Sequence, residues 1–336
     1  MEDVNIGKQS ITCRTIERVA DKTPVLLLGY NRPLQMRGLM QSLATLKPEL
    51  ILLAVDGPRS NRPNDANLVR QTQELASEIT WDAEIRTRFR NSNLGLRRAV
   101  VDAVTWANSD YGQVIVLEDD VRAGPQLLDF LNYNLMAYQE DTVVAHINGY
   151  NLVPKEHLTH PDHASRLSIY PESYAWATWD RAWQKYDDDL TWARNASLKD
   201  IKKICGSTVG ALRWKQNFSD AAAERIDTWA YRWLASMWEH NWLMVSPNRN
   251  IATYTGLEGG THTRRKPKWT ELPINDIYFT DEEPSIGHVI MNEAADTWLG
   301  KKVFGESPFG LAEGVAASIA MSLIKHRPRP PKKSIL

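Results

Sequence analysis

The sequence has little of what marks secreted, membrane-spanning or nucleic-acid-binding proteins. It has two cysteines, Cys13 and Cys205, which are too few for a disulfide framework and do not form a metal-binding spacing. No stretch approaches the roughly 18 consecutive apolar residues of a membrane-spanning helix, and residues 1–21 lack the apolar run of a signal peptide. The 40 Lys and Arg are balanced by 41 Asp and Glu, whereas nucleic-acid-binding domains are usually strongly basic. These absences predict a cytoplasmic protein that does not bind nucleic acid.

What is present in the first half is an alternation of short apolar runs and helical patterns. Strands are expected at 25–28, 51–55, 84–89 and 114–117, and helices at 33–46, 64–79 and 94–108. This alternation predicts an α/β fold with a Rossmann-like, mostly parallel sheet flanked by helices. The second half is rich in Trp and Tyr, with helices expected at 213–223 and 228–241, and the chain closes with a helical extension.

An acidic triplet follows the fourth expected strand directly. Glu118, Asp119 and Asp120 should lie at the carboxyl edge of the sheet, where ligands of parallel α/β proteins bind. Three adjacent carboxylates repel one another unless a cation lies among them. Mn²⁺ or Mg²⁺ would relieve the repulsion and keep open positions for phosphate oxygens. The alternative interpretation is a solvated acidic turn.

A series of short motifs then resembles a known family. In order, these are Leu28–Pro33, Val55–Gly57, Asn93–Arg98, Leu117–Asp120, His146–Asn151, Tyr174–Trp183, Thr228–Trp233 and Thr261–Thr263. Together they resemble bacterial glycosyltransferases of the GT-A type, family 2-like nucleotide-diphospho-sugar transferases related to N-acetylglucosaminyltransferase I. The resemblance covers roughly residues 23–265, so residues 1–22 are expected to be an N-terminal extension and residues 266–336 a C-terminal one.

The resemblance implies an inverting transfer from a nucleotide-diphosphate sugar, usually UDP-linked, to a hydroxyl of a glycan or lipid-linked acceptor. By position, Asp56 would bind the nucleotide base, and Arg32 would lie near the nucleotide and its phosphates. Asp120 would hold the metal, and Glu118 and Asp119 would contact donor sugar, ribose or metal-bound water. Arg97 or Arg98 would reach the phosphates. From the residues alone, Asp56 could instead shape a turn, and the arginines could be surface charges.

The catalytic base is the point at which the sequence departs from the family pattern. Family members commonly have Asp directly after the Trp of the late Thr-Trp motif, where this chain has Ala230. Asp227 is the first candidate to deprotonate the acceptor, although Asp before a helix also serves as a cap. Glu258, in a Gly-rich loop, is the second. If neither serves, the chain either is a non-catalytic relative that binds nucleotide or carbohydrate, or uses a different mechanism.

Three further predictions concern the second half. His262 could bind metal or diphosphate, or be structural. Among the 13 tryptophans, most should lie in the core, with Trp176 the favoured acceptor contact. Apolar residues recur every fourth position near the C-terminus, followed by a basic tail (Leu311, Val315, Ile319, Leu323; Lys325, Arg327, Arg329, Lys332, Lys333). This segment either rests on an anionic inner membrane surface or packs on the domain.

A sugar nucleotidyltransferase is a further alternative, because it shares the layered α/β plan. That class needs a Gly-rich phosphate loop directly after the first strand, and Gly29–Pro33 has a single glycine. The sequence therefore favours the glycosyltransferase hypothesis over this one.

Overall fold

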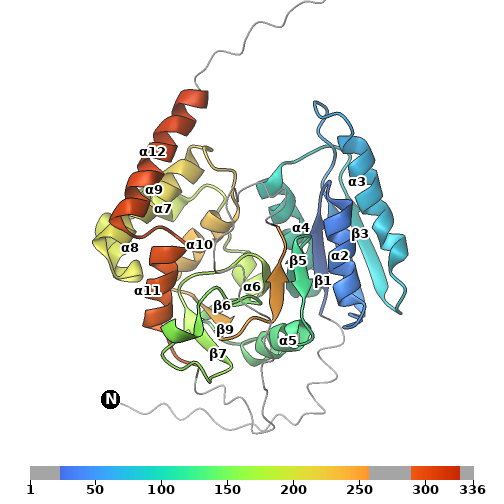
Figure 1. Ribbon diagram of the computed structural model, residues 1–336, viewed down its shortest axis with the longest axis horizontal. Helices are drawn as coiled ribbons and strands as arrows, with labels where there is room; N and C mark the ends of the chain where they lie inside the picture. The colour runs from blue at the N-terminus through green and yellow to red at the C-terminus, as the bar shows by residue number, and fades with distance from the viewer. Residues whose placement is uncertain (1–22, 257–288, 326–336) are drawn as a thin grey trace, which may run out of the picture.

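The computed structural model describes residues 23–256 and 289–325 and has two parts, an α/β half and a helical, aromatic-rich half (Figure 1). The predicted α/β class is confirmed. The first half consists of β1 (Val25–Gly29), α2 (Pro33–Leu43), β2 (Leu50–Val55), α3 (Asp65–Glu74) with the short turn η1 (Leu75–Glu78), β3 (Glu84–Phe89), α4 (Leu96–Tyr111) and β4 (Gln113–Glu118). Every strand and helix expected before residue 118 is present, with boundaries shifted by a few residues.

The second half adds the remaining elements. They are β5 (Val121–Ala123), α5 (Leu127–Ala137), β6 (Val144–Asn148), η2 (Lys155–His157), β7 (Ser165–Ser168), β8 (Ala175–Trp179), α6 (Asp180–Trp183), α7 (Thr191–Asn195), α8 (Leu198–Cys205), α9 (Thr208–Ala222), α10 (Ala230–Glu239), β9 (Leu243–Pro247), β10 (Ala252–Tyr254), α11 (Glu293–Lys302) and α12 (Pro308–Lys325).

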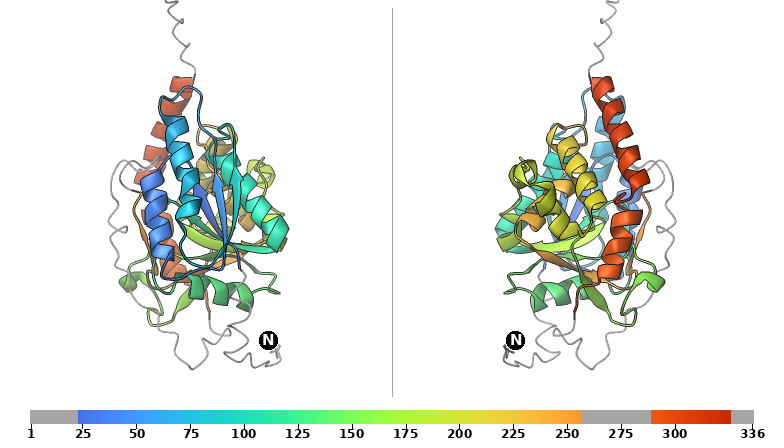
Figure 2. Two further views of the ribbon diagram at one scale, coloured as in Figure 1. Left: turned by 90° about the vertical axis from the view of Figure 1, so that its right-hand side faces the viewer. Right: turned by 90° about the vertical axis from the view of Figure 1, so that its left-hand side faces the viewer.

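The large sheet has the strand order β3-β2-β1-β4-β8-β6-β9-β7, and only β8 and β7 run against the other strands. All residues of β2 are buried, as expected for a parallel strand covered on both faces. Figure 2 shows α2 and α3 on one side of these strands and α4 on the other. Within the described residues, no helix has the length and apolarity needed to cross a membrane.

The order of the strands places a topological switch point in the middle of the sheet. From β1 the chain moves outward to β2 and β3, and then returns to the opposite side of β1 as β4. Because β1, β2 and β4 are parallel neighbours, their carboxyl ends meet at one edge. Ligands of open α/β sheets bind in the crevice at such a point.

Indole rings fill much of the interior of the second half. Trp176 on β8 stacks on Trp229 with ring centroids 5.1 Å apart, and Trp183 on α6 lies against Trp233 on α10 at the same separation. A second group gathers Trp214, Trp238 and Phe218 between α9 and α10. Because these helices pack through large aromatic faces, the second half provides a rigid wall beside the carboxyl edge of the sheet.

Candidate functional site

A pocket of about 270 Å³ lies at the carboxyl edge of the first three parallel strands. Its lining comes from the segments after β1 and β2, the end of β4, the outer strand β3 and the start of α4 (including Tyr30, Asn31, Arg32, Asp56, Arg59, Arg88, Arg90, Asn93, Asp102, Glu118 and Asp119). The pocket is therefore where the switch-point rule expects a ligand.

The acidic triplet lies at one end of this pocket, and Arg32 pairs with it. Arg32 donates from Nε to Asp119 Oδ2 at 3.0 Å, and from Nη2 to Asp119 Oδ1 and, at 3.1 Å, to Asp120 Oδ2. Arg32 follows β1 and the triplet lies at the end of β4, so the pairing of these two strands brings the groups together. The sequence assigned the balancing charge to a metal ion, and the structure shows that Arg32 supplies part of it.

One arginine in direct contact leaves the triplet short of positive charge. Burial raises the pKa of Asp119 to about 7, although the Arg32 charge opposes that rise. Burial, followed by the charges of Asp120 and Asp119, also raises the pKa of Glu118 well above its ordinary value. Within the part of the chain that the structure describes, the buried Oδ1 atom of Asp120 has no hydrogen-bond partner. A buried carboxylate oxygen without a partner is costly, so this site favours an additional cation.

The donor atoms of the triplet fit a divalent ion that is completed by its ligand. Among the described residues, no three or more His, Cys, Asp and Glu side chains are grouped so that they could hold a metal by themselves. Mg²⁺ in phosphate-binding enzymes is commonly held by one or two carboxylates, with phosphate and water oxygens filling the other positions. Asp120 and Asp119 match that pattern, and their oxygens are of the hard type that Mg²⁺ and Mn²⁺ accept.

A small ribbon closes over the triplet from the second half. Strands β5 and β10 pair antiparallel, and Thr255 donates to the carbonyl oxygen of Asp120 from its backbone N at 2.7 Å and from Oγ1 at 3.0 Å. Gly256 packs closely against this site, because a Cβ atom there would lie 2.5 Å from Asp120 Oδ2 and would require that side chain or Tyr254 to shift. The two remaining predicted residues, Glu258 and His262, lie outside the described residues.

Asp56 lines the pocket, but its carboxylate is engaged within the chain. Its oxygens accept hydrogen bonds from the backbone N atoms of Gly57, Leu94 and Gly95 and from Asn93 Nδ2, at 2.8 to 3.2 Å. The carboxylate thereby fixes the loop that leads into α4. Its expected contact with a nucleotide base stays a prediction, and that contact would compete with these bonds.

The sequence argument overlooked several side chains that line the pocket. Arg59 lies over the ring of Tyr30, with its guanidinium carbon 5.3 Å from the ring centroid. Arg88 and Arg90, at the end of β3, both pair with Asp102 on α4. Glu118 was singled out because ligands bind at the carboxyl ends of parallel strands. The same reasoning applies to Arg88 and Arg90, which lie at the carboxyl end of β3. They were missed because β3 is an exposed outer strand with alternating charges.

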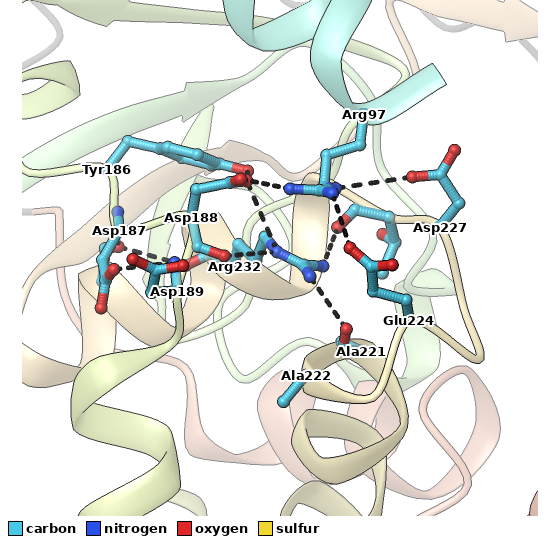
Figure 3. Close-up of polar contacts among 12 residues, drawn as sticks. Arg97, Tyr186, Asp187, Asp188, Asp189, Ala221, Ala222, Glu224, Asp227 and Arg232 are labelled. Carbon is cyan, nitrogen blue, oxygen red and sulfur yellow. Dashed lines mark hydrogen bonds and ion pairs between the residues drawn. The ribbon is translucent and has the colours of Figure 1, made fainter. Parts of the chain in front are cut away.

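Arg97 and Arg98 are not among the residues that line the pocket, and the expected contact of one of them with donor phosphates stays a prediction. Arg97 pairs with Asp188, Glu224 and Asp227, the last at 3.6 Å, and Arg232 lies in the same group (Figure 3). These five residues are referred to below as the Arg97 cluster. Arg98 is exposed on the neighbouring face of α4, because consecutive helical residues point in different directions.

Asp227 does not act as a helix cap. Helix α10 begins at Ala230 with Trp229 in the cap position, and no side-chain hydrogen bond from the cap position closes that end of the helix. Instead the Asp227 carboxylate is exposed beside Gly95, whose added Cβ would lie 3.6 Å from Asp227 Oδ2. Asp227 thus lies next to the loop that Asp56 fixes. It is accessible, and its assignment as a base remains a prediction.

Trp176 requires a correction. Its side chain is 0% exposed, and its ring is packed between His146, at a centroid separation of 5.0 Å, and Trp229. The reason is the position of β8, which lies between β4 and β6 in the middle of the sheet. A ring with no exposed surface cannot stack on an acceptor sugar, so Trp176 is a core residue here.

The comparisons with known proteins provide little further information. No protein-family model matches the sequence, and no curated protein sequence matches it. Among solved structures, a mannosyltransferase from Pyrobaculum calidifontis in complex with GDP-Man and Mn²⁺ is similar to this chain with a TM-score of 0.39 and 10% sequence identity. The match covers 90% of this chain and 75% of that one. At that identity and TM-score the likeness carries no weight for activity.

Proposed function

We propose that this protein is a metal-dependent glycosyltransferase that uses a nucleotide-diphosphate sugar, a UDP-sugar in the first instance, as its donor. The observation that carries the proposal is the buried Asp119–Asp120 pair at the switch point. One oxygen of the pair has no hydrogen-bond partner among the described residues, and a pocket lies beside it. The ordered motifs of the sequence favour the same activity. Acceptors of the matching chemistry are hydroxyl groups of glycans or lipid-linked sugars.

In the proposed complex, Asp120 and Asp119 hold Mn²⁺ or Mg²⁺, which supplies Lewis-acid stabilisation of the departing diphosphate. Arg32 keeps Asp119 oriented through its two-point contact. Tyr30 and Arg59 provide an aromatic face with a cation above it on the pocket wall, which suits a nucleotide base and its phosphates. Residues 257–265, including Glu258 and His262, continue the chain directly from Gly256, which packs against Asp120.

The chemical step is a displacement at the anomeric carbon. The acceptor oxygen forms a bond to that carbon, and the bond from the carbon to the diphosphate oxygen breaks with its electron pair going to the diphosphate. The acceptor proton passes to a carboxylate base. Asp227 is the preferred base because it is accessible and borders the loop that carries Asn93 and Gly95. Glu258 is the alternative.

A melting experiment with metal and nucleotide tests donor binding. UDP with Mn²⁺ should raise the melting temperature of the full chain, whereas UDP with a chelator should not, because only the ternary complex stabilises the native state. Asp120→Asn should abolish the metal-dependent shift. Asp110→Asn, at an exposed residue near the end of α4, is the matched control and should keep it. A nucleotide shift of equal size without metal, or one retained in Asp120→Asn, would overturn the proposed metal site.

Turnover is tested separately from binding. Asp227→Asn should keep the metal-dependent shift and lose transfer or donor hydrolysis by at least about a hundredfold, in the range expected for a lost general base. If Asp227→Asn turns over normally while Glu258→Gln does not, the base is Glu258.

A second candidate is a non-catalytic nucleotide- or sugar-binding relative. The observations in its favour are that Arg32 already occupies the triplet, that Asp56 is fully engaged, and that Ala230 replaces the expected Asp. This candidate predicts metal-dependent binding of UDP-sugars without any hydrolysis over many hours. Detectable hydrolysis that is lost in Asp120→Asn eliminates it.

A further inference from the structure

Arg97 belongs to the first half of the protein, and acids from the second half surround it. It lies in the first turn of α4, and its side chain is 10% exposed. Its Nη1 donates to Asp188 and its Nη2 to Glu224 Oε1 at 3.3 Å, while its Nε lies 3.6 Å from Asp227 Oδ1 (Figure 3). A nearly buried cation therefore has three exposed carboxylates around it.

Arg232 holds the segment that carries two of these acids. It is buried on α10 and donates from Nη2 to the carbonyl oxygen of Ala221 and from Nη1 to that of Thr228, both at 2.8 Å. These bonds fix both ends of the segment in which Glu224 and Asp227 lie. Bonds of a charged group to backbone carbonyls are among the stronger hydrogen bonds, so the segment is well anchored beside α4.

The two oxygens of Asp227 face different groups. Oδ1 pairs with Arg97, whereas Oδ2 lies beside Gly95, where an added Cβ would be 3.6 Å away. Gly95 has a φ of 86°, in the left-handed region that favours glycine, and its N donates to Asp56 at 3.2 Å. Asn93, two residues earlier in the same loop, lines the pocket. One oxygen of Asp227 is therefore anchored, and the other faces the loop that borders the pocket.

Neutralising Arg97 does not require Asp227. Asp188 and Glu224 both accept hydrogen bonds from Arg97, whereas the 3.6 Å contact with Asp227 is longer than a hydrogen bond. The side chain of Asp227 is 57% exposed, so a hydroxyl group can approach it. Asp227 is thus the acid of the Arg97 cluster that is placed to react with a ligand.

We propose that Arg97 is the positioning residue of Asp227. Its guanidinium holds Oδ1, so that Oδ2 is directed at the acceptor hydroxyl beside the pocket. The acceptor oxygen bonds to the anomeric carbon, its proton passes to Oδ2, and the bond from that carbon to the diphosphate breaks with its electron pair going to the diphosphate. Arg97 keeps its own protons throughout. This role rests on the proposed glycosyltransferase function and differs from the phosphate contact that the sequence suggested.

Removing the anchor should slow the chemical step without weakening donor binding. Misplacing a reacting group by about 1 Å can cost up to about a hundredfold in rate. Arg97→Gln should therefore lower kcat by at least about tenfold, with KM and the Mn²⁺-dependent melting shift with UDP unchanged. Arg97→Lys keeps a cation and should recover part of the loss. The assay is hydrolysis of UDP-glucose, UDP-galactose or UDP-N-acetylglucosamine with Mn²⁺, in which water replaces the acceptor.

A double-mutant cycle separates a positioning role from a structural one. If Arg97 acts through Asp227, its removal should have no further effect once Asp227 is changed, so R97Q/D227N should match Asp227→Asn in kcat to within about twofold. Arg225→Gln is the matched control, because Arg225 lies in the same segment but pairs with Asp220. It should keep kcat to within about twofold. Melting temperatures without ligand show whether each variant is folded.

The possible outcomes separate this role from its alternatives. A raised KM and a lost UDP shift in Arg97→Gln would assign Arg97 to the donor phosphates and overturn the positioning role. An equal loss of kcat in Arg225→Gln, or an undiminished loss in the Asp227→Asn background, would make Arg97 a structural ion pair only.

Two further outcomes distinguish failure of this role from failure of the proposed function. Normal turnover by Asp227→Asn would overturn the positioning role and leave the glycosyltransferase function intact. A wild-type chain that shows the Mn²⁺-dependent UDP shift but hydrolyses none of the three UDP-sugars would favour the non-catalytic relative and also overturn the role. Absence of both hydrolysis and the shift would overturn the proposed function itself.

Discussion

Two arginine–carboxylate clusters in this protein contain similar groups but bury opposite partners. At the triplet, the side chains of Asp119 and Asp120 are 4% and 6% exposed, while that of Arg32 is 28% exposed. In the Arg97 cluster the arginines are buried, and the carboxylates are between 48% and 68% exposed (Asp188, Asp227, Glu224). Water solvates an exposed carboxylate, whereas a buried one depends on partners within the site. An added cation should therefore stabilise the carboxylates of the triplet more than those of the Arg97 cluster.

The same difference gives the two clusters opposite responses to pH. At the triplet, burial raises the pKa of Asp119 to about 7, so its ionisation costs stability as pH rises from the ordinary Asp value through that pKa. In the Arg97 cluster, burial alone would raise the pKa of Asp188, but its bond and charge interaction with Arg97 outweigh burial and lower it. Ionised Asp188 therefore stabilises the fold.

The largest expected effect comes from removing Arg32. Arg32→Gln removes the cation that bonds directly to the two buried carboxylates and should lower the free energy of unfolding by about 3 kcal/mol at pH 8 without metal. Mn²⁺ should restore part of this loss, because it replaces the missing charge. Urea denaturation with Mn²⁺ and with a chelator measures both effects. If Mn²⁺ restores nothing, the triplet is not a cation site in the absence of donor.

A smaller effect is expected from the equivalent change in the other cluster. Arg97→Gln should lower the free energy of unfolding by about 1 kcal/mol, because its carboxylate partners are solvated once the arginine is gone. Mn²⁺ should make no difference to that loss. The same denaturation series serves as the measurement. Equal losses in Arg32→Gln and Arg97→Gln would mean that burial of the acid does not distinguish the two clusters.

The smallest effect is expected from Asp188→Asn and depends on pH. Because the pKa of Asp188 is lowered in the folded state, its stabilisation is present above the ordinary Asp pKa of about 4 and is lost as pH falls through the lowered value. The variant should be less stable than the wild type by under about 1 kcal/mol at pH 7. The difference should shrink as pH falls below the ordinary Asp pKa of about 4. A difference that grows on acidification would reverse the assigned sign.

The sequence was sufficient for the first half of the fold because the relevant signals are local. Continuous apolar runs marked β1, β2 and β4, and apolar residues at helical spacing marked the helices between them. The position of the acidic triplet at a strand end followed from the same pattern. Parallel strands and their connecting helices leave few arrangements, so local signals led directly to the correct edge of the sheet.

Local sequence patterns could not predict which distant side chains contact one another. Arg32 and Arg97 both precede or begin helices near strand ends, and both were candidates for contact with the donor phosphates. Arg32 meets the triplet because β1 is hydrogen-bonded to β4, whereas Arg97 points across the fold to the segments before α7 and α10. Such contacts join residues about ninety positions apart in the sequence, and no local pattern encodes them.

The sequence by itself determined an alternating α/β half, an acidic edge and an aromatic second half, because apolar periodicity and residue type are properties of neighbouring positions. Only the tertiary structure decided that Trp176 is enclosed between β4 and β6, that Arg32 balances the acids, and that α12 packs against α9 through glycine and serine. Each of these outcomes depends on which side chains are buried when segments distant in the sequence pack against one another. At such contacts a small side chain allows two segments to approach more closely than a large apolar one does.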